Sequence, residues 1–477
     1  MLERYVRSAG AYLPLLRLDR KTARAALSWS GTGGAGAGRR SVAGWDEDAL
    51  TMAVEAARLA VGHDHVQGVV FASTSAPFRE RLQSGIVADA LGLPADTGAA
   101  DVAGSRRCGI AALRQALRDR SGSVLVAAGE RRISAPGNSL QLTWGDGGAA
   151  VLVGNTGQAK LIGESTINVD LVDVYASADH PLPYQTEERF IRDEAIERVL
   201  LPAVTAALGK ARIGPEHIKL AALQEPVAGV YRTVATKLGL KAPNLCERIS
   251  EAAGDLGAAH ALFGLALALE EAAVGDRILV AGFGSGCDVI ILEVTSEGAA
   301  RCSAANALSH GAALSSYTRF LSLSGALDLD WGPRSELDQK TSASVLMRHV
   351  REMHGFVGGR DNRGNVQFPK TLIPVSPGAN GPEKLQDVRL ADMPARIMSV
   401  TADRLNFTPD PPFHFGLVQF ENGARVLMEF RDVENGTPKV GDPLQMRFRV
   451  KSIDRKRGFR TYFWKAAPLD RLPLEKS

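Results

Sequence analysis

The stretch Asp101-Val-Ala-Gly-Ser-Arg-Arg-Cys-Gly-Ile-Ala-Ala-Leu113 decides the fold of this chain. Its first residues are typical of the end of a strand, and the small and apolar residues from Cys108 onward predict a buried helix. Strands that lead directly into helices are the building units of α/β proteins, in which helices cover both faces of the sheet. The stretch therefore predicts one such unit, with Arg106 and Arg107 at the turn.

The same alternation extends over residues 1 to about 298. Short apolar runs at Val69–Ser73, Ser123–Ala128 and Ile278–Gly284 are typical of buried strands. Helical patterns at Asp46–Val61 and Glu194–Lys210 separate such runs. Continuous apolar strands with helices between them indicate a sheet that is buried on both faces.

The pattern changes after residue 298. Residues 299 to about 355 predict loop and helix, with the clearest helix at Ser342–His354, and from about residue 356 the pattern is all-β. Arg425–Phe430 and Gln445–Val450 alternate with a period of two, and Gly458–Trp464 supplies a last strand. About five or six short strands in this part of the chain suit a small barrel.

Composition excludes several classes of protein. The 477 residues predict two or three domains, and the net charge of +3 points to no particular partner. The four cysteines match no zinc or redox spacing and predict no disulfide framework. We find no secretory signal and no apolar stretch of about 20 residues that would span a bilayer. We therefore expect a cytoplasmic protein with reduced cysteines and no membrane association.

Three segments resemble the hydroxymethylglutaryl-CoA synthase and ketoacyl synthase III branch of the thiolase superfamily. They are Trp45–Arg58, Glu187–Glu194 and Gly275–Gly286, in the order that the family has them. The resemblance covers most of residues 3–298. It implies an α/β protein with the duplicated five-layer thiolase-like fold, whose halves would be residues 1–160 and 161–298. It also implies a homodimer, because such domains pair across a two-fold axis.

The C-terminal part resembles the small OB-fold, acyl-CoA-associated proteins that accompany thiolase-like enzymes. Phe368-Pro369, Asp410–Phe413, Gly423–Val426 and Tyr462–Lys465 carry this likeness. It implies a helical linker over residues 299–355 and a small all-β OB barrel within residues 356–477. Those proteins usually begin with a four-cysteine zinc ribbon, but the equivalent residues 358–369 contain no cysteine. We therefore expect a degenerate arm and no metal.

The resemblance also locates the catalytic positions. The family uses a Glu, a Cys, a His and an Asn, and the matching positions hold Thr74, Arg106, Gln224 and Asp255. Arginine stays protonated in proteins and forms no acyl-enzyme. Four changes in one site argue against a synthase that condenses through the usual cysteine.

The polar residues that remain could still carry chemistry. Arg106, Gln224, Glu225, Asp255 and His260 are the candidates. Cysteine-independent retro-aldol cleavage needs a base for a β-hydroxyl and donors for the thioester enolate. Glu225 either points into a cleft or faces solvent, His260 is either a base or a buried histidine with satisfied hydrogen bonds, and Asp255 is either in the site or an N-cap. Arg106 would suit a substrate with a free carboxylate.

Cys108 lies two residues beyond Arg106, at the start of the same predicted helix. A helix N-terminus lowers the pKa of a thiol, which would make Cys108 an alternative nucleophile. The other interpretation is a small core residue, because free cysteines are often buried. We keep both.

The function that we expect is cleavage or formation of a carbon–carbon bond in a β-oxo- or β-hydroxy-acyl substrate, or acyl transfer to coenzyme A, without the standard cysteine. Acyl-CoA or the corresponding β-oxo or β-hydroxy acid would be the substrate. The alternative is a non-catalytic scaffold subunit that binds a thiolase-family partner. Nucleic-acid binding ranks third: Lys451, Arg455, Lys456, Arg457 and Arg460 form a basic hairpin, but a solvated tip or a CoA contact explains it better.

Overall fold

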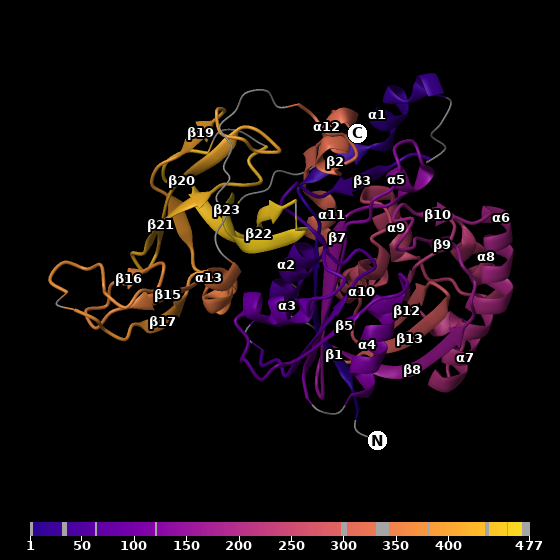
Figure 1. Ribbon diagram of the computed structural model, residues 1–477. Coiled ribbons are helices and arrows are strands. Elements are labelled where there is room, and N and C mark those ends of the chain that lie inside the picture. The colour runs from indigo at the N-terminus through magenta and orange to yellow at the C-terminus, as the bar shows by residue number, and fades with distance from the viewer. Residues whose placement is uncertain are drawn as a thin grey trace. The chain divides into compact units, whose positions relative to one another are not determined.

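The computed structural model describes residues 3–30, 36–62, 64–119, 122–296, 303–330, 343–379, 381–434, 438–455 and 457–469. The chain forms two compact units (Figure 1). The first unit comprises residues 1–43, 48–87 and 96–326, and the second comprises residues 44–47, 88–95 and 327–477.

A nine-stranded sheet forms the centre of the first unit. Its spatial order is β11 (Leu220–Leu223), β12 (Arg277–Phe283), β13 (Gly286–Val294), β8 (Ala159–Asn168), β1 (Tyr5–Tyr12), β7 (Gly147–Gly154), β6 (Val124–Glu130), β4 (Gly68–Ala72) and β5 (Gly98–Val102). Almost all residues of β6, β7, β12 and β13 are buried, as their continuous apolar sequence predicts.

The strand pairing repeats itself within this sheet. In one half, β1 pairs antiparallel with β7, β7 antiparallel with β6, and β6 parallel with β4. In the other half, β8, β13, β12 and β11 follow each other with the same three relations. The halves join where Tyr5 and Val6 pair with Lys160 and Ala159. The strand pairing of one half is thus the same as that of the other, and the two halves join between β1 and β8.

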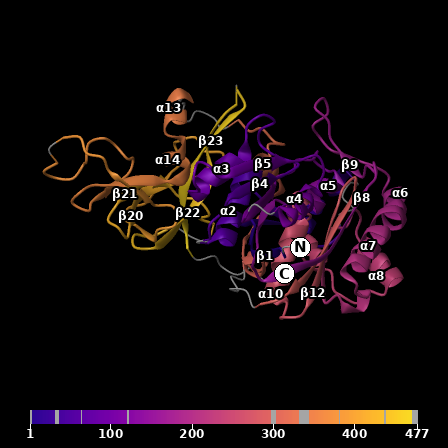
Figure 2. The ribbon, with the colours of Figure 1, turned by 90° about the horizontal axis from the view of Figure 1, so that it is seen from below.

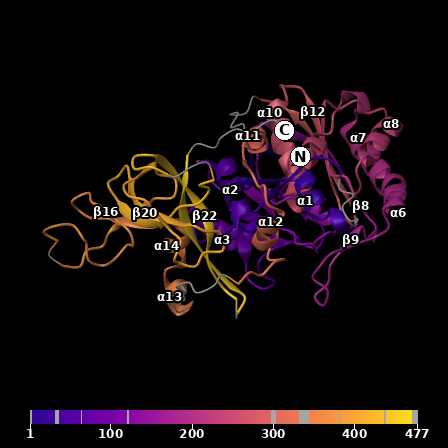
Figure 3. The same ribbon diagram turned by 90° about the horizontal axis from the view of Figure 1, so that it is seen from above.

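Helices form three layers around the two half-sheets. One outer layer contains α2 (Ala49–Val61), which packs on β1, β6 and β7, and the other contains α7 (Leu201–Ala211), which packs on β8 and β13. Between the half-sheets lie α4 (Cys108–Arg118) and α10 (His260–Glu271), each of which contacts strands of both halves. Helices α6 (Glu188–Glu194), α7 and α8 (Val230–Leu238) lie side by side at one edge (Figures 2 and 3). The first unit is therefore a mixed α/β structure in which helices lie on and between the two half-sheets.

Small residues permit the close packing of these layers. A Cβ atom at Gly129 would lie 1.9 Å from the carbonyl oxygen of Ala49 on α2. A Cβ atom at Gly109 on α4 would lie 2.1 Å from the carbonyl oxygen of Ala258. Real Cβ atoms do not approach backbone oxygens so closely, so glycine is required at both positions. The second contact brings the start of α4 against the segment that leads into α10.

Smaller elements complete the first unit. One small sheet has the order β14 (Ala312–Ala313), β2 (Leu16–Asp19), β3 (Arg39–Val42), and β9 (Val174–Tyr175) pairs with β10 (Tyr184–Gln185). The other helical segments are α1 (Arg20–Ala26), η1 (Ser28–Ser30), α5 (Ser139–Thr143), the π-helical η2 (Ala195–Leu200), η3 (Pro215–His217), α9 (Leu245–Ala252), η4 (Gly257–Ala259), α11 (Ser303–Ser309) and α12 (Tyr317–Leu323), while α3 (Gln83–Leu91) begins in this unit. Within residues 299–355, for which we predict a linker, the part up to Ala326 belongs to the first unit.

The second unit contains two short helices and two sheets. The helix expected over residues 342–354 is broken at His349 into α13 (Ala343–Arg348) and α14 (Val350–Gly355). A three-stranded sheet has the order β16 (Val366–Gln367), β15 (Val357–Arg360), β17 (Gln386–Arg389). A six-stranded sheet has the order β19 (Thr401–Asp403), β20 (Phe413–Phe420), β18 (Ala395–Ile397), β22 (Pro443–Asp454), β23 (Phe459–Pro468), with β21 (Arg425–Glu429) paired to β20.

The closed OB barrel that we expected is not present in the described residues of the second unit. The paired strands of the six-stranded sheet do not close into a ring. The end of β21 is joined to β23 by an isolated bridge between Phe430 and Ala466. Aromatic rings fill the core instead of a regular barrel interior: Phe356 and Phe448 pack against Trp464, whose Nε1 donates to the carbonyl of His354 at 2.6 Å. Of the expected basic hairpin, Lys456 lies outside the described residues, and Lys451 forms an ion pair with Glu429.

A cluster of buried charges also belongs to the second unit. The Lys465 ammonium lies 3.1 Å from Asp46 and 2.8 Å from Glu429. Asp46 also pairs with Arg431 at 3.1 Å, and Glu47 pairs with Arg449 at 3.1 Å. Burial opposes ionisation of Asp46, but these cations outweigh it and hold the pKa of the carboxyl well below its usual range. We call this set the Lys465 cluster.

None of the described helices is long and apolar enough to cross a membrane. In the same part of the chain, no group of three or more His, Cys, Asp or Glu side chains is arranged to hold a metal ion.

Candidate functional site

The candidate residues gather where several elements of the first unit end or begin. Arg106 lies on the turn from β5 to α4, Gln224 directly follows β11, and Asp255 lies between α9 and η4. Each position follows from local sequence, because the polar residue comes directly after a buried strand or before a helical turn. The fold brings these three side chains into contact, although 31 or more residues separate any two of them.

Arg106 is held by two carboxylates. Its Nη1 atom donates to Asp255 at 3.1 Å, and its Nη2 atom forms an ion pair with Asp173. The guanidinium carbon lies 5.6 Å from the ring centre of Phe283. Only 10% of the Arg106 side chain is exposed. Arg106, which we expected at the family's nucleophile position, is therefore a cation held in place by two carboxylates.

Asp255 is the centre of this network. Its Oδ1 atom accepts from Gln224 Nε2 at 3.1 Å, from the Gly257 N–H at 2.7 Å and from Arg132 at 3.2 Å. Burial opposes its ionisation, but the charges of Arg132 and Arg106 outweigh burial and hold the pKa of Asp255 well below the usual range. Asp255 thus binds both arginines and accepts from the first N–H of the η4 turn, whose N-cap residue is Leu256. We call Arg106, Arg132, Asp173, Gln224 and Asp255 the Asp255 network.

Gln224 holds two backbone segments together rather than extending into an open space. It is 1% exposed, and besides Asp255 its Nε2 atom donates to the carbonyl of Gly257 at 3.0 Å. Both amide hydrogens are therefore used within the network. Gln224 orients Asp255.

Glu130 is a buried carboxylate that the sequence analysis missed. It ends β6 and accepts from the N–H of Thr74 at 2.8 Å, the hydroxyl of Thr74 at 2.9 Å, and the N–H of Ala258 at 3.2 Å. Ser75 donates its hydroxyl to the other oxygen at 2.5 Å. Thr74, at the family's Glu position, is thus a partner of a different glutamate.

Arg132 and Asp173 were missed as well. The signal for Glu130 and Arg132 was available, because charged residues directly follow the buried run Val124–Gly129, and side chains at strand ends gather at one edge of a sheet. Asp173 has no such signal: it lies in the loop that precedes β9 and reaches Arg106 only through the tertiary fold.

His260 has a structural position. Its Nδ1 atom accepts from the N–H of Leu256 at 3.1 Å, and its Nε2 atom lies 3.4 Å from the hydroxyl of Ser250. Burial lowers its pKa, although Asp255 opposes this shift. Both ring nitrogens serve the loop before α10, so the side chain is a satisfied, neutral histidine and does not face the Asp255 network as a base.

Glu225 does not join the network either. Its carboxylate accepts from the N–H groups of Tyr231 at 2.5 Å and Gly229 at 3.1 Å, at the start of α8. Burial raises its pKa to about 7 against these two hydrogen bonds. The side chain caps a helix, which is neither of the two roles that the sequence left open.

Cys108 is the first residue of α4 and points into the core. It is 3% exposed and belongs to the apolar cluster between the half-sheets. Burial and the charge of Glu130 raise the pKa of its thiol against the N–H groups at the start of the helix. A thiol whose pKa is raised is a poor nucleophile.

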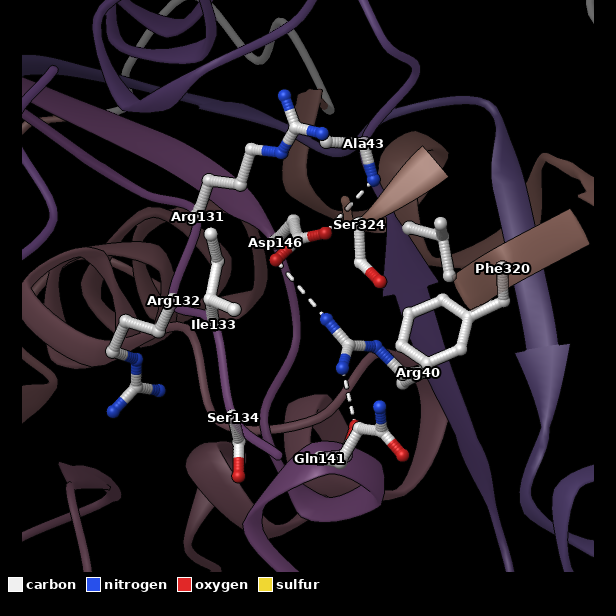
Figure 4. Close-up of a pocket in the computed structure, with 11 residues that line it drawn as sticks. Arg40, Ala43, Arg131, Arg132, Ile133, Ser134, Gln141, Asp146, Phe320 and Ser324 are labelled. Atoms are coloured by element: carbon white, nitrogen blue, oxygen red, sulfur yellow. Dashed lines mark hydrogen bonds and ion pairs between the residues drawn. The ribbon is translucent and has the colours of Figure 1, made fainter. Parts of the chain in front are cut away.

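A pocket lies next to the Asp255 network (Figure 4). Its walls come from β3, the segment after β6, α5 and α12. The lining residues are Arg40, Val42, Ala43, Arg131, Arg132, Ile133, Ser134, Gln141, Asp146, Phe320 and Ser324. Because Arg132 also binds Asp255, the pocket and the network share one guanidinium.

No family model matches the sequence. Among curated proteins, the hydroxymethylglutaryl-CoA synthase of Aeropyrum pernix is 30% identical over 294 residues, which are 58% of this chain and 80% of that protein. The synthase of Methanopyrus kandleri is also 30% identical over 294 residues, with 58% and 83% covered. That of Archaeoglobus fulgidus is 28% identical over 305 residues, with 60% and 88% covered.

Solved structures share the fold. The HMG synthase of the curacin biosynthetic pathway, solved in complex with an acetyl donor acyl carrier protein, superposes with a TM-score of 0.58 at 17% identity and covers 69% of this chain and 92% of its own. An HMG-CoA synthase complexed with CoA gives 0.58 at 16% identity, with 71% and 95% covered. Xanthomonas campestris OleA gives 0.52 at 19% identity, with 61% and 96% covered.

Proposed function

Because the chain belongs to the hydroxymethylglutaryl-CoA synthase family, we propose that it acts on a CoA thioester and makes or breaks a carbon–carbon bond beside the thioester group. This is the chemistry of an acyltransferase of the thiolase superfamily. Coenzyme A would enter as the carrier of the acyl group, and a β-oxo- or β-hydroxy-acyl compound would be the second reactant or the product.

We further propose that the reaction proceeds without an acyl-cysteine. The observation that supports this proposal is the environment of Arg106, whose guanidinium is bound by Asp173 and Asp255. The thiol of Cys108, two residues beyond Arg106 in the sequence, lies in the core and has a raised pKa. An acyl-enzyme needs an accessible thiolate, which this geometry does not supply.

The Asp255 network supports electrostatic catalysis instead. Arg106 and Arg132 would stabilise the negative charge that develops on the thioester oxygen when an enolate forms, and fixed donors do this best where water is excluded. Asp255 would be the proton acceptor. A carboxylate with a lowered pKa is a weak base, so the two guanidinium groups have to supply most of the stabilisation.

Arg106→Gln tests this proposal directly. Glutamine keeps a polar side chain but removes the positive charge, and we expect turnover to fall about 100-fold or more, as for the loss of one oxyanion donor. Release of free CoA from acetyl-CoA and acetoacetyl-CoA, alone and with β-oxo acids, measures it, with mass spectrometry of products and intact protein. Arg107→Gln is the matched control, because Arg107 contacts Ile167 and Asn168 rather than the network.

The outcomes separate the alternatives. Product formation without a protein adduct supports cysteine-independent chemistry, whereas an acyl adduct that disappears in Cys108→Ala contradicts it. A specific observation favours a second candidate, the non-catalytic scaffold: each guanidinium of the Asp255 network already has a carboxylate partner, as in a purely structural ion cluster. Absence of both turnover and CoA binding would favour that scaffold, whose thiolase-family partner a pull-down would identify.

Two further proposals concern assembly and the C-terminal part of the chain. Two copies of the chain pair as a homodimer in our interpretation, and light scattering on the purified protein tests this. Residues 356–477 act as an acyl-CoA-associated domain, and their deletion should abolish activity. Retained full activity in the deletion variant would refute that role.

A further inference from the structure

Trp144 directly follows α5 and lies outside the Asp255 network, yet it contacts two members of that network. Its backbone makes the first contact. The N–H of Asp255 donates to the carbonyl of Thr143 at 2.8 Å, and the N–H of Gly145 donates to the carbonyl of Asp255 at 2.9 Å. The residues on both sides of Trp144 are therefore bonded to Asp255, and Trp144 and Asp255 form a parallel bridge.

Two glycines permit the close approach of these segments. A Cβ atom at Gly145 would lie 1.9 Å from the carbonyl oxygen of Ala253, and a Cβ atom at Gly254 would lie 2.7 Å from the carbonyl carbon of Trp144. Gly254 also has a φ of +88°, which favours glycine. A larger residue at either position would separate the two segments. The backbone of Trp144 is thus fixed closely against the segment that contains Asp255.

The indole ring of Trp144 makes the second contact. The guanidinium carbon of Arg132 lies 4.1 Å from the centre of the ring, and Trp144 is 6% exposed. The face of an indole attracts a guanidinium, and the attraction is stronger where water is excluded. Arg132 in turn donates through Nη2 to the carbonyl of Asp255 at 2.6 Å and to its Oδ1 atom at 3.2 Å. Trp144, Arg132 and Asp255 therefore form a closed ring of contacts.

The two arginines of the Asp255 network are held in different ways. Arg106 uses two nitrogens, because Nη1 donates to Asp255 and Nη2 pairs with Asp173. Arg132 is bound to Asp255 through Nη2, and its buried Nε atom has no hydrogen-bond partner among the described residues. A guanidinium that is bound through one nitrogen can turn about that contact. The indole ring of Trp144 restricts this rotation, because it covers one face of the guanidinium.

We propose that Trp144 is a positioning residue, whose indole ring sets the orientation of the Arg132 guanidinium toward the thioester oxygen of the substrate. This inference rests on the function proposed above, in which Arg132 stabilises the negative charge on that oxygen. Donors that are already oriented stabilise a developing charge best, because they need no reorganisation during the reaction. Arg132 is available for this role at the wall of the neighbouring pocket (Figure 4). Trp144 touches no reactant and acts through Arg132.

Trp144→Leu and Trp144→Phe test this role in steady-state kinetics of CoA release from the CoA thioesters named above. Leucine removes the aromatic face, and we expect kcat to fall about tenfold, which corresponds to one buried cation–π contact. KM should change by less than about twofold, because the oriented guanidinium acts on the transition state. Phenylalanine keeps an aromatic face and should retain kcat within about threefold of the parent value. A tryptophan that only packs would affect stability and leave kcat unchanged in both variants.

A double-mutant cycle measures the contact between Trp144 and Arg132 without any reaction. Trp144→Leu, Arg132→Met and the double variant are unfolded in urea, and methionine keeps an apolar stem at position 132. We expect the two changes to be coupled by about fivefold or more in the unfolding equilibrium constant. Trp144→Met fills more of the space and replaces Trp144→Leu if the latter does not fold.

Trp45→Leu is the matched control. The ring of Trp45 also packs on a cation, with its centre 4.4 Å from the ammonium of Lys465 in the second unit. Its replacement should lower stability, but it should show no coupling to Arg132→Met and should leave kcat within about twofold of the parent value.

Two results would overturn the inference. One is the absence of coupling between Trp144→Leu and Arg132→Met. The other is a parent chain that releases CoA and keeps its kcat in Trp144→Leu. Failure of the proposed function gives a different result: the parent chain would release no CoA from any of the thioesters, although the cycle still shows coupling. The contact would then serve the fold alone, and the positioning role would fall with the proposed function.

Discussion

The Asp255 network of the first unit and the Lys465 cluster of the second unit contain the same kinds of groups in different surroundings. Lys465 and Asp46 are 1% and 2% exposed, and Trp45 also covers the ammonium at 4.4 Å. Arg106 and Asp255 are 10% and 17% exposed and lie beside a pocket with unsatisfied donors. Ion pairs that are fully enclosed hold a structure together, whereas ion pairs that a ligand can reach can also serve chemistry.

Breaking the Lys465 cluster should have the largest effect. Asp46→Ala leaves the Lys465 ammonium buried without one of its two carboxylates, which should lower the free energy of unfolding by about 3–5 kcal/mol. Urea unfolding followed by tryptophan fluorescence measures it. Lys451→Met is the matched control: Lys451 contacts the same Glu429 but is about half exposed, and its loss should cost less than about 1 kcal/mol. An equal loss of unfolding free energy in the two variants would show that the enclosed ion pairs stabilise the fold no more than an exposed one does.

Asp255→Asn should affect activity more than stability. The neutral amide no longer balances Arg106 and Arg132, and we expect about 2–3 kcal/mol less stability, as for the loss of charged hydrogen bonds to a buried group. Turnover should fall by more than about 100-fold, because the proposed proton acceptor is lost. Steady-state kinetics and urea unfolding on the same variant separate the two effects. If kcat is unchanged while stability falls, the network is only structural, like the Lys465 cluster.

Glu225 is a third buried carboxylate to set beside Asp46 and Asp255. Backbone N–H groups rather than cations bind its carboxylate. Burial raises its pKa to about 7 from an ordinary value of 4.5. Between these pH values the folded state binds more protons than the unfolded chain, so stability falls as the pH rises, by at most about 1.4 kcal/mol per pH unit. Asp46 and Asp255 have lowered pKa values, and their contributions are lost only as the pH falls below about 3.8.

In the Glu225→Gln variant, the free energy of unfolding should therefore depend less on pH between pH 4.5 and 7 than it does in the parent chain. Urea midpoints across this range measure the change. Glu216→Gln, which changes an exposed glutamate, should leave the profile as it is. A parent profile that rises over this range and is unaffected by Glu225→Gln would contradict the raised pKa.

Cys108→Ala should have the smallest effect. Its thiol touches only the core between the half-sheets, so we expect about 1 kcal/mol less stability from the small cavity. Turnover should stay within about twofold of the parent value. Loss of turnover together with a normal fold would show that Cys108 is the nucleophile after all.

Sequence reasoning predicted the architecture of the first unit, because the information is local. Buried strands such as Val124–Gly129 are continuous apolar runs, and glycines such as Gly109 mark where layers approach closely. It was less successful for the second unit. Alternating strands such as Arg425–Glu429 indicate a sheet with one buried face, but they do not determine whether its edges meet, and here the barrel does not close.

From the sequence by itself we predicted that Arg106 replaces the family's nucleophile and that Gln224 and Asp255 replace two of its partners, because each prediction follows from neighbouring residues. Only the tertiary structure decided what these residues contact. Asp173 and Arg132 reach Arg106 and Asp255 from distant segments, while His260 and Glu225 turn to backbone groups of their own loops. The physical reason is that a strand end or a helix start places a residue at an edge of the sheet, whereas the packing of distant segments decides which charge it meets there.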